Sequence, residues 1–256
     1  MSDIDWSQVP AAIWRRYRQG LRPVTQPDPV KWEDLQGIDA QKERLAHNTE
    51  RFLRGLPANH ALLWGARGTG KSSLVKALLN RYRDQGLRVI EVDKDDLINL
   101  PEIVDSIRER PERFILYCDD LSFGVGEAGY KPLKSVLEGS IELPPENVRL
   151  YVTSNRRHLM PEYMRDNESA TMVDGEIHPG EAVEEQVSLS DRFGLWLSFY
   201  PFSQETYLAA VDALFPEVAD REQLHREALQ FALARGGRSG RTAQQFFRSC
   251  AGENGY

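Results

Sequence analysis

Cysteine, long apolar runs and a surplus of positive charge are all scarce in this sequence, and each absence excludes a class of protein. The 256 residues contain two cysteines, Cys118 and Cys250. Two are too few for a disulfide framework or a zinc-binding cysteine cluster, which indicates a reducing compartment. No apolar run approaches the roughly 18 residues that a membrane-spanning helix needs, and the first ten residues lack the apolar core of a secretory signal. We therefore expect a soluble, cytoplasmic protein without a membrane span.

The charge balance is acidic, because 32 Lys and Arg residues stand against 39 Asp and Glu residues, for a formal net charge of -7. This balance disfavours binding to nucleic acid or to anionic membranes through bulk charge, but it leaves room for a local basic patch. The stretch from Trp14 to Arg18, together with Arg22, is one such patch, and it could contact a partner or an acidic surface. A protein partner and a nucleic-acid partner therefore both stay open.

Length and composition predict one large domain with a small appendage. Hydrophobic residues make up 41% of the chain, with 19 Gly and 14 Pro, which is ordinary usage for a globular protein. Residues 1–30 predict a short helix followed by an extended linker, because Pro23 and Pro27 remove backbone donors and disfavour helix before them. Asp39 is expected to cap a helix that reaches about Arg54.

Strands and helices then alternate along residues 31–201, which we interpret as the core of the protein. Short apolar runs predict strands and segments of helical spacing predict helices, in the order 61–64, 71–83, 87–92, 101–110, 114–118, 131–138, 150–153 and 193–200. This alternation is typical of a parallel sheet sandwiched by helices. The strands are continuously apolar, as expected for a sheet covered on both faces. The predicted fold class is therefore α/β.

Two segments depart from this alternation. Residues 162–186 are acidic and poor in large apolar side chains, so we interpret them as a long surface insertion in the core. Residues 202–256 read as helix only, with helical segments at 204–214, 221–235 and 241–250 and with Ser203 as a cap. They predict a small C-terminal helical lid.

The most informative motif runs from Gly65 to Ser72 and fits G-x-x-x-x-G-K-[ST] without deviation. Its glycines allow a tight turn whose backbone N–H groups surround phosphate oxygens, and the following helix adds the positive end of its dipole. Lys71 is expected to reach the β- and γ-phosphates, and Ser72 to ligate Mg²⁺. The motif predicts binding of a nucleotide with Mg²⁺ by Gly65, Gly68, Thr69, Gly70, Lys71, Ser72 and Ser73.

Polar side chains end two of the predicted strands. Asp119 and Asp120 follow the strand 114–118, and Asn155 follows the strand 150–153. Ligands of doubly wound sheets bind at the carboxyl ends of strands, so these side chains are expected beside the phosphates. We expect Asp119 to join Ser72 in the metal shell, Asp120 to orient or polarise the attacking water, and Asn155 to hold that water. Asp120 is short for this role and would need Glu127 or a bridging water to reach.

These motifs, in this order, resemble those of AAA+ ATPases. The P-loop resembles the Walker A motif, 116–120 the Walker B motif and 153–155 the sensor 1 segment, while 32–39 resembles the segment that packs the adenine. The resemblance covers about residues 30–250, and it implies that Ile38 contacts the base. A narrower similarity joins the chain to an uncharacterised bacterial group of single-domain AAA+ ATPases, a domain of unknown function.

The same resemblance implies roles for two arginines. Residues 190–194 resemble an arginine-finger region, which would let Arg192 reach the nucleotide of a neighbouring copy in a homo-oligomer. The start of the last helix resembles the sensor 2 position, which would place Arg241, or failing that Arg238, on the γ-phosphate of its own chain. The chain departs from the family pattern where Asp120 replaces the usual glutamate and where Gly124 replaces an acidic residue.

Three functions are compatible with these motifs. The first is an ATPase that couples Mg-ATP binding and hydrolysis to conformational change on an unknown macromolecular partner. The second is a nucleotide-dependent adaptor or switch with little turnover, which the two departures leave open. The third is a small-molecule P-loop kinase, because the carboxylates of residues 91–96 could present to a polyol acceptor; such a kinase would have no C-terminal helical subdomain.

Overall fold

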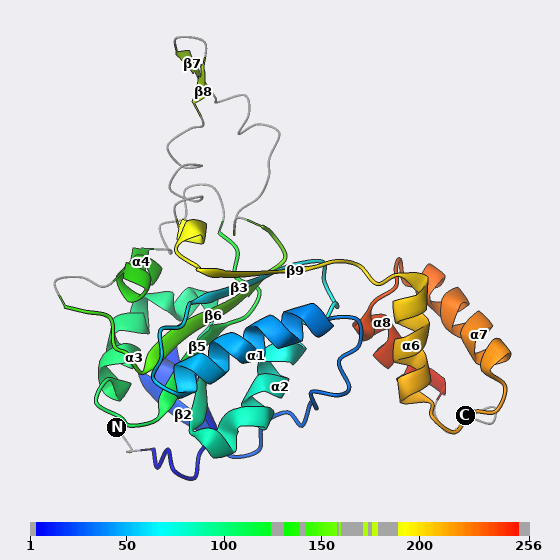
Figure 1. The fold of residues 1–256 in the computed structure, drawn as a ribbon, viewed down its shortest axis with the longest axis horizontal. Coiled ribbons are helices and arrows are strands. Elements are labelled where there is room, and N and C mark those ends of the chain that lie inside the picture. The colour runs from blue at the N-terminus through cyan, green and yellow to red at the C-terminus, as the bar shows by residue number, and fades with distance from the viewer. Residues whose placement is uncertain are drawn as a thin grey trace.

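The computed structural model describes residues 4–123, 131–138, 142–157, 159, 171–173, 176–178 and 189–250. These residues form a seven-stranded sheet with helices on both faces, and a group of three C-terminal helices lies to one side of it (Figure 1). The predicted α/β fold class is confirmed.

Six strands of the large sheet run parallel, and the seventh, β2, is antiparallel at one edge. The strand order is β2-β1-β4-β5-β6-β3-β9. The strands are β1 (Ala11–Arg15), β2 (Gly20–Val24), β3 (Ala61–Gly65), β4 (Leu87–Glu91), β5 (Arg113–Cys118), β6 (Val148–Ser154) and β9 (Leu195–Phe199). All five predicted strands are present. Strands β5, β6 and β3 are consecutive and parallel, so their carboxyl ends lie on the same side of the sheet. The phosphate motif follows β3 there, and the acidic residues follow β5.

Helices cover both faces of the sheet and enclose a separate apolar cluster on each side. One cluster lies under α1 (Asp39–Leu53) and α2 (Lys71–Tyr82), and the other under α3 (Leu100–Ile107) and α4 (Lys131–Glu138). Short 3-10 turns stand at η1 (Arg16–Arg18), η2 (Arg83–Gln85) and η3 (Lys94–Asn99). The continuous burial of β5, from Phe114 to Cys118, follows from this coverage on two sides.

The structure corrects the expected cap of α1. Ile38 is the residue that precedes the helix, and no side chain caps it there. Asp39 is the first helical residue instead, and its carboxylate lies 3.4 Å from Lys42 Nζ. A carboxylate in the first turn still favours the helix through its dipole, which explains why the residue type looked like a cap.

The predicted N-terminal helix and linker are wrong. Residues 11–24 form the β1–β2 hairpin, and β1 adds to the sheet beside β4 in parallel register, with Ala11 opposite Val89. Trp14 is 4% exposed in the core cluster beneath α3 and α4, so burial of this ring fixes which face of the hairpin packs inward. Pro23 is tolerated because β2 is an edge strand, where a missing N–H donor costs no ladder bond.

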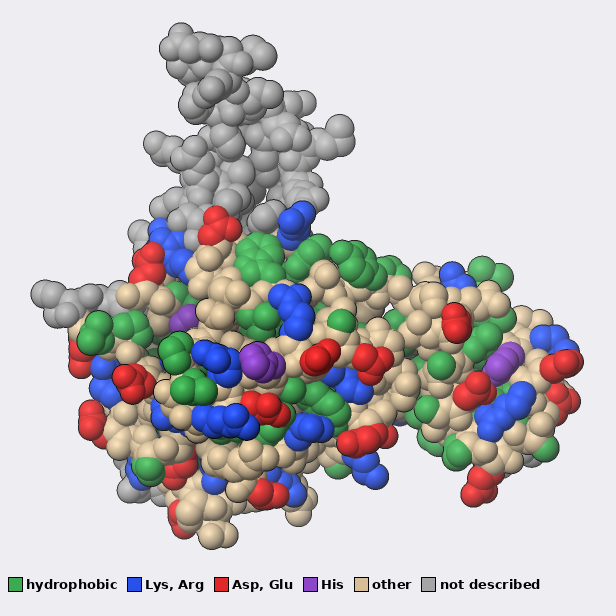
Figure 2. Space-filling view, viewed as in Figure 1, with side chains coloured by type: hydrophobic (Ala, Val, Ile, Leu, Met, Phe, Trp, Pro, Cys, Tyr) green, Lys and Arg blue, Asp and Glu red, His purple; other side chains and the backbone are tan. Residues whose placement is uncertain are grey.

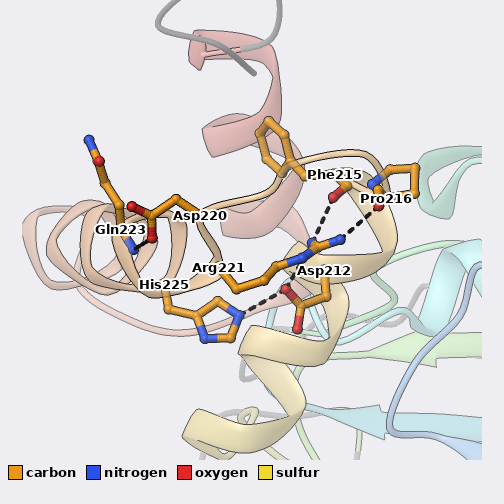
Figure 3. A network of polar contacts seen from close by, with 7 residues as sticks. All are labelled: Asp212, Phe215, Pro216, Asp220, Arg221, Gln223 and His225. Carbon is orange, nitrogen blue, oxygen red and sulfur yellow. Dashed lines mark hydrogen bonds and ion pairs between the residues drawn. The ribbon is translucent and has the colours of Figure 1, made fainter.

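Helices occupy the three predicted C-terminal segments, as α6 (Gln204–Leu214), α7 (Arg221–Ala234) and α8 (Gly240–Cys250). Ser203 Oγ caps α6 by accepting from Thr206 N at 3.0 Å, as predicted. The three helices enclose their own core around Tyr207 and Phe246. A polar network of Asp212, Phe215, Pro216, Asp220, Arg221, Gln223 and His225 joins α6 to α7 (Figure 3). The lid therefore has the packing of a small independent unit.

Most of the predicted insertion at 162–186 lies outside the described residues. Within it the structure describes one antiparallel pair, β7 (Thr171–Val173) and β8 (Glu176–His178). Among the described residues, no helix has the length and apolar character required to cross a bilayer.

A buried polar network attaches α1 to the sheet. Tyr151 of β6 is fully buried, and its hydroxyl accepts from Asn48 Nδ2 at 3.0 Å and lies 2.8 Å from Thr49 Oγ1. Asn48 also receives the backbone N–H of Asn59 at 2.9 Å. Because each buried polar atom finds a partner, the network specifies how α1 sits over the sheet without leaving donors unpaired.

His60, directly before β3, makes folding stability depend on pH. Its Nδ1 accepts from Leu150 N at 2.9 Å, and burial, followed by the charge of Arg149, lowers its pKa to about 4. The unfolded chain takes up this proton near pH 6.5, so stability is complete above that value and falls as pH drops toward 4. We expect a loss of at most about 3 kcal/mol in the free energy of unfolding across this window. Urea titrations at a series of pH values measure it.

The matched variant is His60→Asn, whose side-chain oxygen can still accept from Leu150 but does not titrate. It is expected to flatten the pH dependence between about 6.5 and 4 while leaving stability at pH 7 nearly unchanged. An equally steep dependence in the variant would show that another group is responsible.

Candidate nucleotide-binding site

The backbone of the phosphate motif has conformations that require glycine. Gly65, Gly68 and Gly70 have φ values of +133°, +75° and +99°. A Cβ at Gly65 would lie 2.0 Å from the carbonyl oxygen of Phe199, and one at Gly68 would lie 2.8 Å from Ser239 Oγ. The motif is therefore held tightly between β9 and the lid, and α2 begins directly after it at Lys71. Thr69 is 1% exposed, and its hydroxyl closes the turn by donating to Ala66 O at 2.8 Å.

Lys71 lies at the centre of the site. Its Nζ donates to Gly65 O and Ala66 O, each at 2.8 Å, and to Asn155 Oδ1 at 3.1 Å. Burial lowers the pKa of Lys71 to about 8; Asp120 and Asp119 oppose this shift, whereas the charges of Arg241 and Arg67 add to it. Three cationic side chains thus converge on the phosphate motif, and a bound polyanion would relieve their repulsion.

Asp119, at the end of β5, is held by two hydroxyl groups. Ser72 Oγ donates to its Oδ1 at 2.7 Å, and Thr153 Oγ1 donates to the same oxygen. Burial acts to raise the pKa of this carboxyl, but the hydrogen bonds from Thr153 and Ser72 help to hold it below its usual value. The carboxylate is therefore ionised at neutral pH and sits against a hydroxyl, which is the hard oxygen set that Mg²⁺ prefers.

Asp120 and Asn155 form a second polar pair beside the lysine. Asn155 Nδ2 donates to Asp120 Oδ1, while the amide oxygen of the same residue accepts from Lys71. Asp120 has a φ of +50°, and its N–H donates to Thr153 Oγ1 at 2.9 Å. This left-handed turn points the carboxylate at Asn155 instead of continuing the strand. Glu127 and Gly124, which the sequence singled out near Asp120, lie outside the described residues.

The start of α8 and the segment before α1 both contact the motif. Arg241 N donates to Gly68 O at 3.3 Å, so the start of α8 touches the phosphate loop. Ile38 is 4% exposed, and its Cδ1 lies 3.5 Å from the position of a Cβ on Gly70. Thr206 of α6 packs against Gly37, whose φ is +71°. Ile38 and Arg241 therefore both adjoin the loop on which the expected roles depend.

Arg192 lies in a different setting. Its Nε donates to Glu138 Oε1 at the end of α4, and the arginine side chain is 22% exposed. A single chain cannot test a contact with a neighbouring copy, so the expected role of Arg192 stays a prediction. Arg238 is exposed just before α8.

Sequence reasoning missed the importance of Thr153. The residue was noted only as part of the sensor 1 resemblance, yet its hydroxyl donates to Asp119 and accepts from the backbone of Asp120. The available signal was its position at the carboxyl end of an apolar strand, next to the strand that carries the carboxylates. Of the other residues expected at the site, Ser73 is half-buried in the first turn of α2.

A family model described as "Protein of unknown function (DUF815)" matches residues 7–254. The chain belongs to the DUF815 family. The DUF815 chain is also 38% identical over 69 residues to the replication factor C large subunit of Staphylothermus marinus. That match covers 27% of this chain and 16% of the relative, so the chain spans about a sixth of the length of this curated protein.

Solved structures show a similar fold. The Aeropyrum pernix Orc1 protein in complex with DNA matches with a TM-score of 0.57 at 18% identity, over 82% of this chain and 58% of Orc1. The Thermotoga maritima RuvB Holliday junction branch migration motor matches with a TM-score of 0.47 at 15% identity, over 86% of this chain and 72% of RuvB. The likeness to Orc1 shows that the DUF815 chain shares its fold, a mostly parallel sheet with helices on both faces.

Proposed function

We propose that this DUF815 protein is an AAA+ type ATPase that binds Mg-ATP and couples hydrolysis to movement of its lid on an unknown macromolecular partner. The observation that carries the proposal is the continuous polar chain from Lys71 through Asn155 to Asp120, beside the ionised Asp119. This arrangement supplies a cation for the phosphates and a carboxylate placed to act on water. The lid contact at Gly68 offers a route from nucleotide to conformational change.

The residues of the site fit Mg²⁺ as well as ATP. Ser72 and Asp119 would hold the ion. Among the described residues no three His, Cys, Asp or Glu side chains form a group that could hold a metal ion alone, so nucleotide oxygens would complete its shell. When bound, Mg²⁺ neutralises phosphate charge and orients the triphosphate. Lys71 then binds the β- and γ-phosphates, and the glycine turn provides N–H donors without side-chain obstruction.

The remaining residues are proposed to act on the attacking water, on the γ-phosphate and on the coupling of the lid to nucleotide state. Asn155 is proposed to hold the attacking water, and Asp120 to orient it or accept its proton. Arg241, at the start of α8, is proposed to meet the γ-phosphate and couple the lid to nucleotide state. Arg192 is proposed to act in trans in a homo-oligomer, where a guanidinium near the γ-phosphate stabilises the transition state.

Asp120→Asn tests the proposed hydrolysis directly. The amide keeps the shape of the side chain but cannot accept a proton, so we expect phosphate release to fall about 10²–10⁴-fold with ATP affinity unchanged. A coupled phosphate assay and calorimetry measure the two quantities. The control is Asp84→Asn, which alters a carboxylate that is 92% exposed and distant in sequence from the motifs. Equal turnover in wild type and Asp120→Asn would remove Asp120 from the chemistry.

An adaptor or switch with little turnover is the second candidate, and it is favoured by the short reach of Asp120, whose carboxylate is engaged by Asn155. Tight ATP binding with turnover below about 0.01 per second at every protein concentration would select it. The kinase alternative is weaker, because the chain has the C-terminal helices that such an enzyme would lack. In residues 91–96, moreover, Asp93 caps η3 and Asp96 is buried. Phosphate release from ATP and water without an added acceptor would exclude it.

A further inference from the structure

The β1–β2 hairpin differs in charge from the rest of the molecule. Between Asp5 and Asp28 the chain has four arginines and no acidic residue, whereas the whole chain carries -7. The hairpin region therefore contributes +4 and the remainder -11, since 28 basic residues there stand against 39 acidic ones. On the face shown in Figure 2 acidic and basic side chains are interspersed. A basic segment without carboxylates is thus a local feature of this hairpin.

The tip of the hairpin presents an aromatic ring to solvent. Tyr17, in η1, is fully exposed with a relative accessibility of 103%, while Trp14 nearby is buried. A ring so exposed contributes nothing to the core, and in sequence it stands between Arg16 and Arg18. The ring offers both of its faces to a planar partner.

All four arginines are also exposed. Arg16 Nε lies 4.0 Å from Asp96 Oδ1 of η3, and the Arg16 side chain is 66% exposed; Arg15 adds positive potential at the same carboxylate. Arg15, Arg18 and Arg22 are exposed. In the register of the hairpin, Ile13 stands opposite Arg22 and Arg15 stands opposite Gly20. Arg15 and Arg22 are therefore diagonal neighbours on one face, with their Cα atoms roughly 7–8 Å apart.

The tip of the hairpin lies at the carboxyl ends of the parallel strands, where the nucleotide site also lies. Strand β1 is parallel to β4, and β4 to β5, so Arg15 ends its strand at the same edge where Asp119 follows β5. A polymer held by the hairpin would therefore run along the side of the molecule where ATP is proposed to act, two strands away from Asp119.

We propose that the tip formed by Tyr17 with Arg15, Arg18 and Arg22 binds single-stranded nucleic acid, with a base stacked on the tyrosine and phosphates on the guanidinium groups. Proteins that bind single strands combine aromatic platforms with basic side chains in this way. The arginine fork matches phosphate geometry, and the exposed ring matches a base that is not paired. The inference goes beyond the proposed ATPase function and does not rest on it, since binding requires no turnover.

Other polyanions fit the hairpin less well. An acidic peptide added as a strand to β2 would meet Pro23, which has no N–H donor for a ladder bond. Poly-glutamate also has no aromatic group that would stack on the ring of Tyr17. Duplex nucleic acid keeps its bases stacked internally, so it would engage the arginines alone.

Fluorescence anisotropy with a labelled oligo-dT of about 20 nucleotides tests the inference, at low salt and without ATP. We expect wild type to bind with a Kd of about 1–100 µM. Tyr17→Ala is expected to weaken binding about 10-fold, because stacking on one base is lost. Tyr17→Phe retains the ring and should bind within about twofold of wild type.

The salt dependence gives a second readout. The double variant Arg18→Gln/Arg22→Gln is expected to reduce the slope of log Kd against log salt by about 1.4, as for two lost phosphate contacts on a single strand. Arg54→Gln/Arg226→Gln removes two exposed arginines elsewhere and should leave the slope unchanged. Arg16 is kept in every variant because it contacts Asp96 within the chain.

Three results would overturn the inference: no binding of oligo-dT by folded wild type, equal binding by Tyr17→Ala, or equal affinity for a duplex or for poly-glutamate. Each of these results is independent of nucleotide chemistry. If wild type binds the single strand but not Mg-ATP, the proposed function fails and this inference stands. If it binds Mg-ATP but not the strand, the reverse holds.

Discussion

Lys71→Met should reduce the affinity for Mg-ATP by about 100-fold or more while leaving a folded protein. The ammonium group donates to two carbonyls of the phosphate loop and to Asn155. Because it is already buried, an anion that binds it displaces little water. Removing one member of a buried, hydrogen-bonded charge pair costs about 2–5 kcal/mol, or roughly 30- to 5,000-fold in affinity. Methionine retains the apolar stem, so the packing around α2 is kept. Calorimetric titration with Mg-ATP measures the change.

Lys76→Met is the control for this experiment. Lys76 lies on the same helix, 2.9 Å from Asp28, and its side chain is 46% exposed. It should bind Mg-ATP as wild type does, and its thermal unfolding should resemble that of Lys71→Met to within a few degrees. If Lys71→Met binds Mg-ATP with wild-type affinity, the loop does not hold the triphosphate and the proposed function is wrong.

Arg192→Ala should lower ATP turnover by about 10³-fold or more without lowering ATP affinity, because the guanidinium is proposed to act on the nucleotide of a neighbouring copy. The specific activity of wild type should accordingly rise with protein concentration. Mixing inactive Arg192→Ala with inactive Lys71→Met should restore part of the activity. In the mixture an intact loop from the first variant can meet an intact arginine from the second, and only an interface site allows this recovery.

The ion pair with Glu138 supplies the control. Glu138→Gln removes the negative charge that pairs with Arg192 but keeps the guanidinium. If the arginine acts in trans, the Glu138→Gln variant should remain active. If the ion pair is purely structural, Glu138→Gln should lower ATP turnover as much as Arg192→Ala does. Absence of recovery in the mixture, with both variants folded, would place Arg192 outside the reaction.

Local patterns were sufficient for much of the site. The spacing of Gly65, Lys71 and Ser72 defines a loop followed by a helix, and the structure has both at these positions. Asp119 follows an apolar strand, and its place beside Ser72 follows from the common edge of parallel strands. Such inferences need only short-range regularities, which are written in consecutive residues.

Long-range packing decided the rest. The composition of the basic segment around Trp14 is compatible with a helix, a strand or a loop. The segment forms a strand here because it pairs with the edge of β4 and buries the Trp14 ring against the sheet. The contact of α8 with Gly68 and the two hydrogen bonds of Thr153 join residues far apart in sequence. No periodicity or motif encodes such a pairing.

The sequence alone therefore determined that a phosphate loop, a neighbouring carboxylate and an alternating α/β core are present, because each depends on side chains close together in the chain. The tertiary structure alone decided that the N-terminal hairpin completes the sheet and that Thr153 holds the carboxylate of Asp119 and the backbone N–H of Asp120. It also decided that Arg192 rests on Glu138 within its own chain. These outcomes depend on which surfaces meet when the chain closes, and the free energy of burying those surfaces belongs to the whole fold.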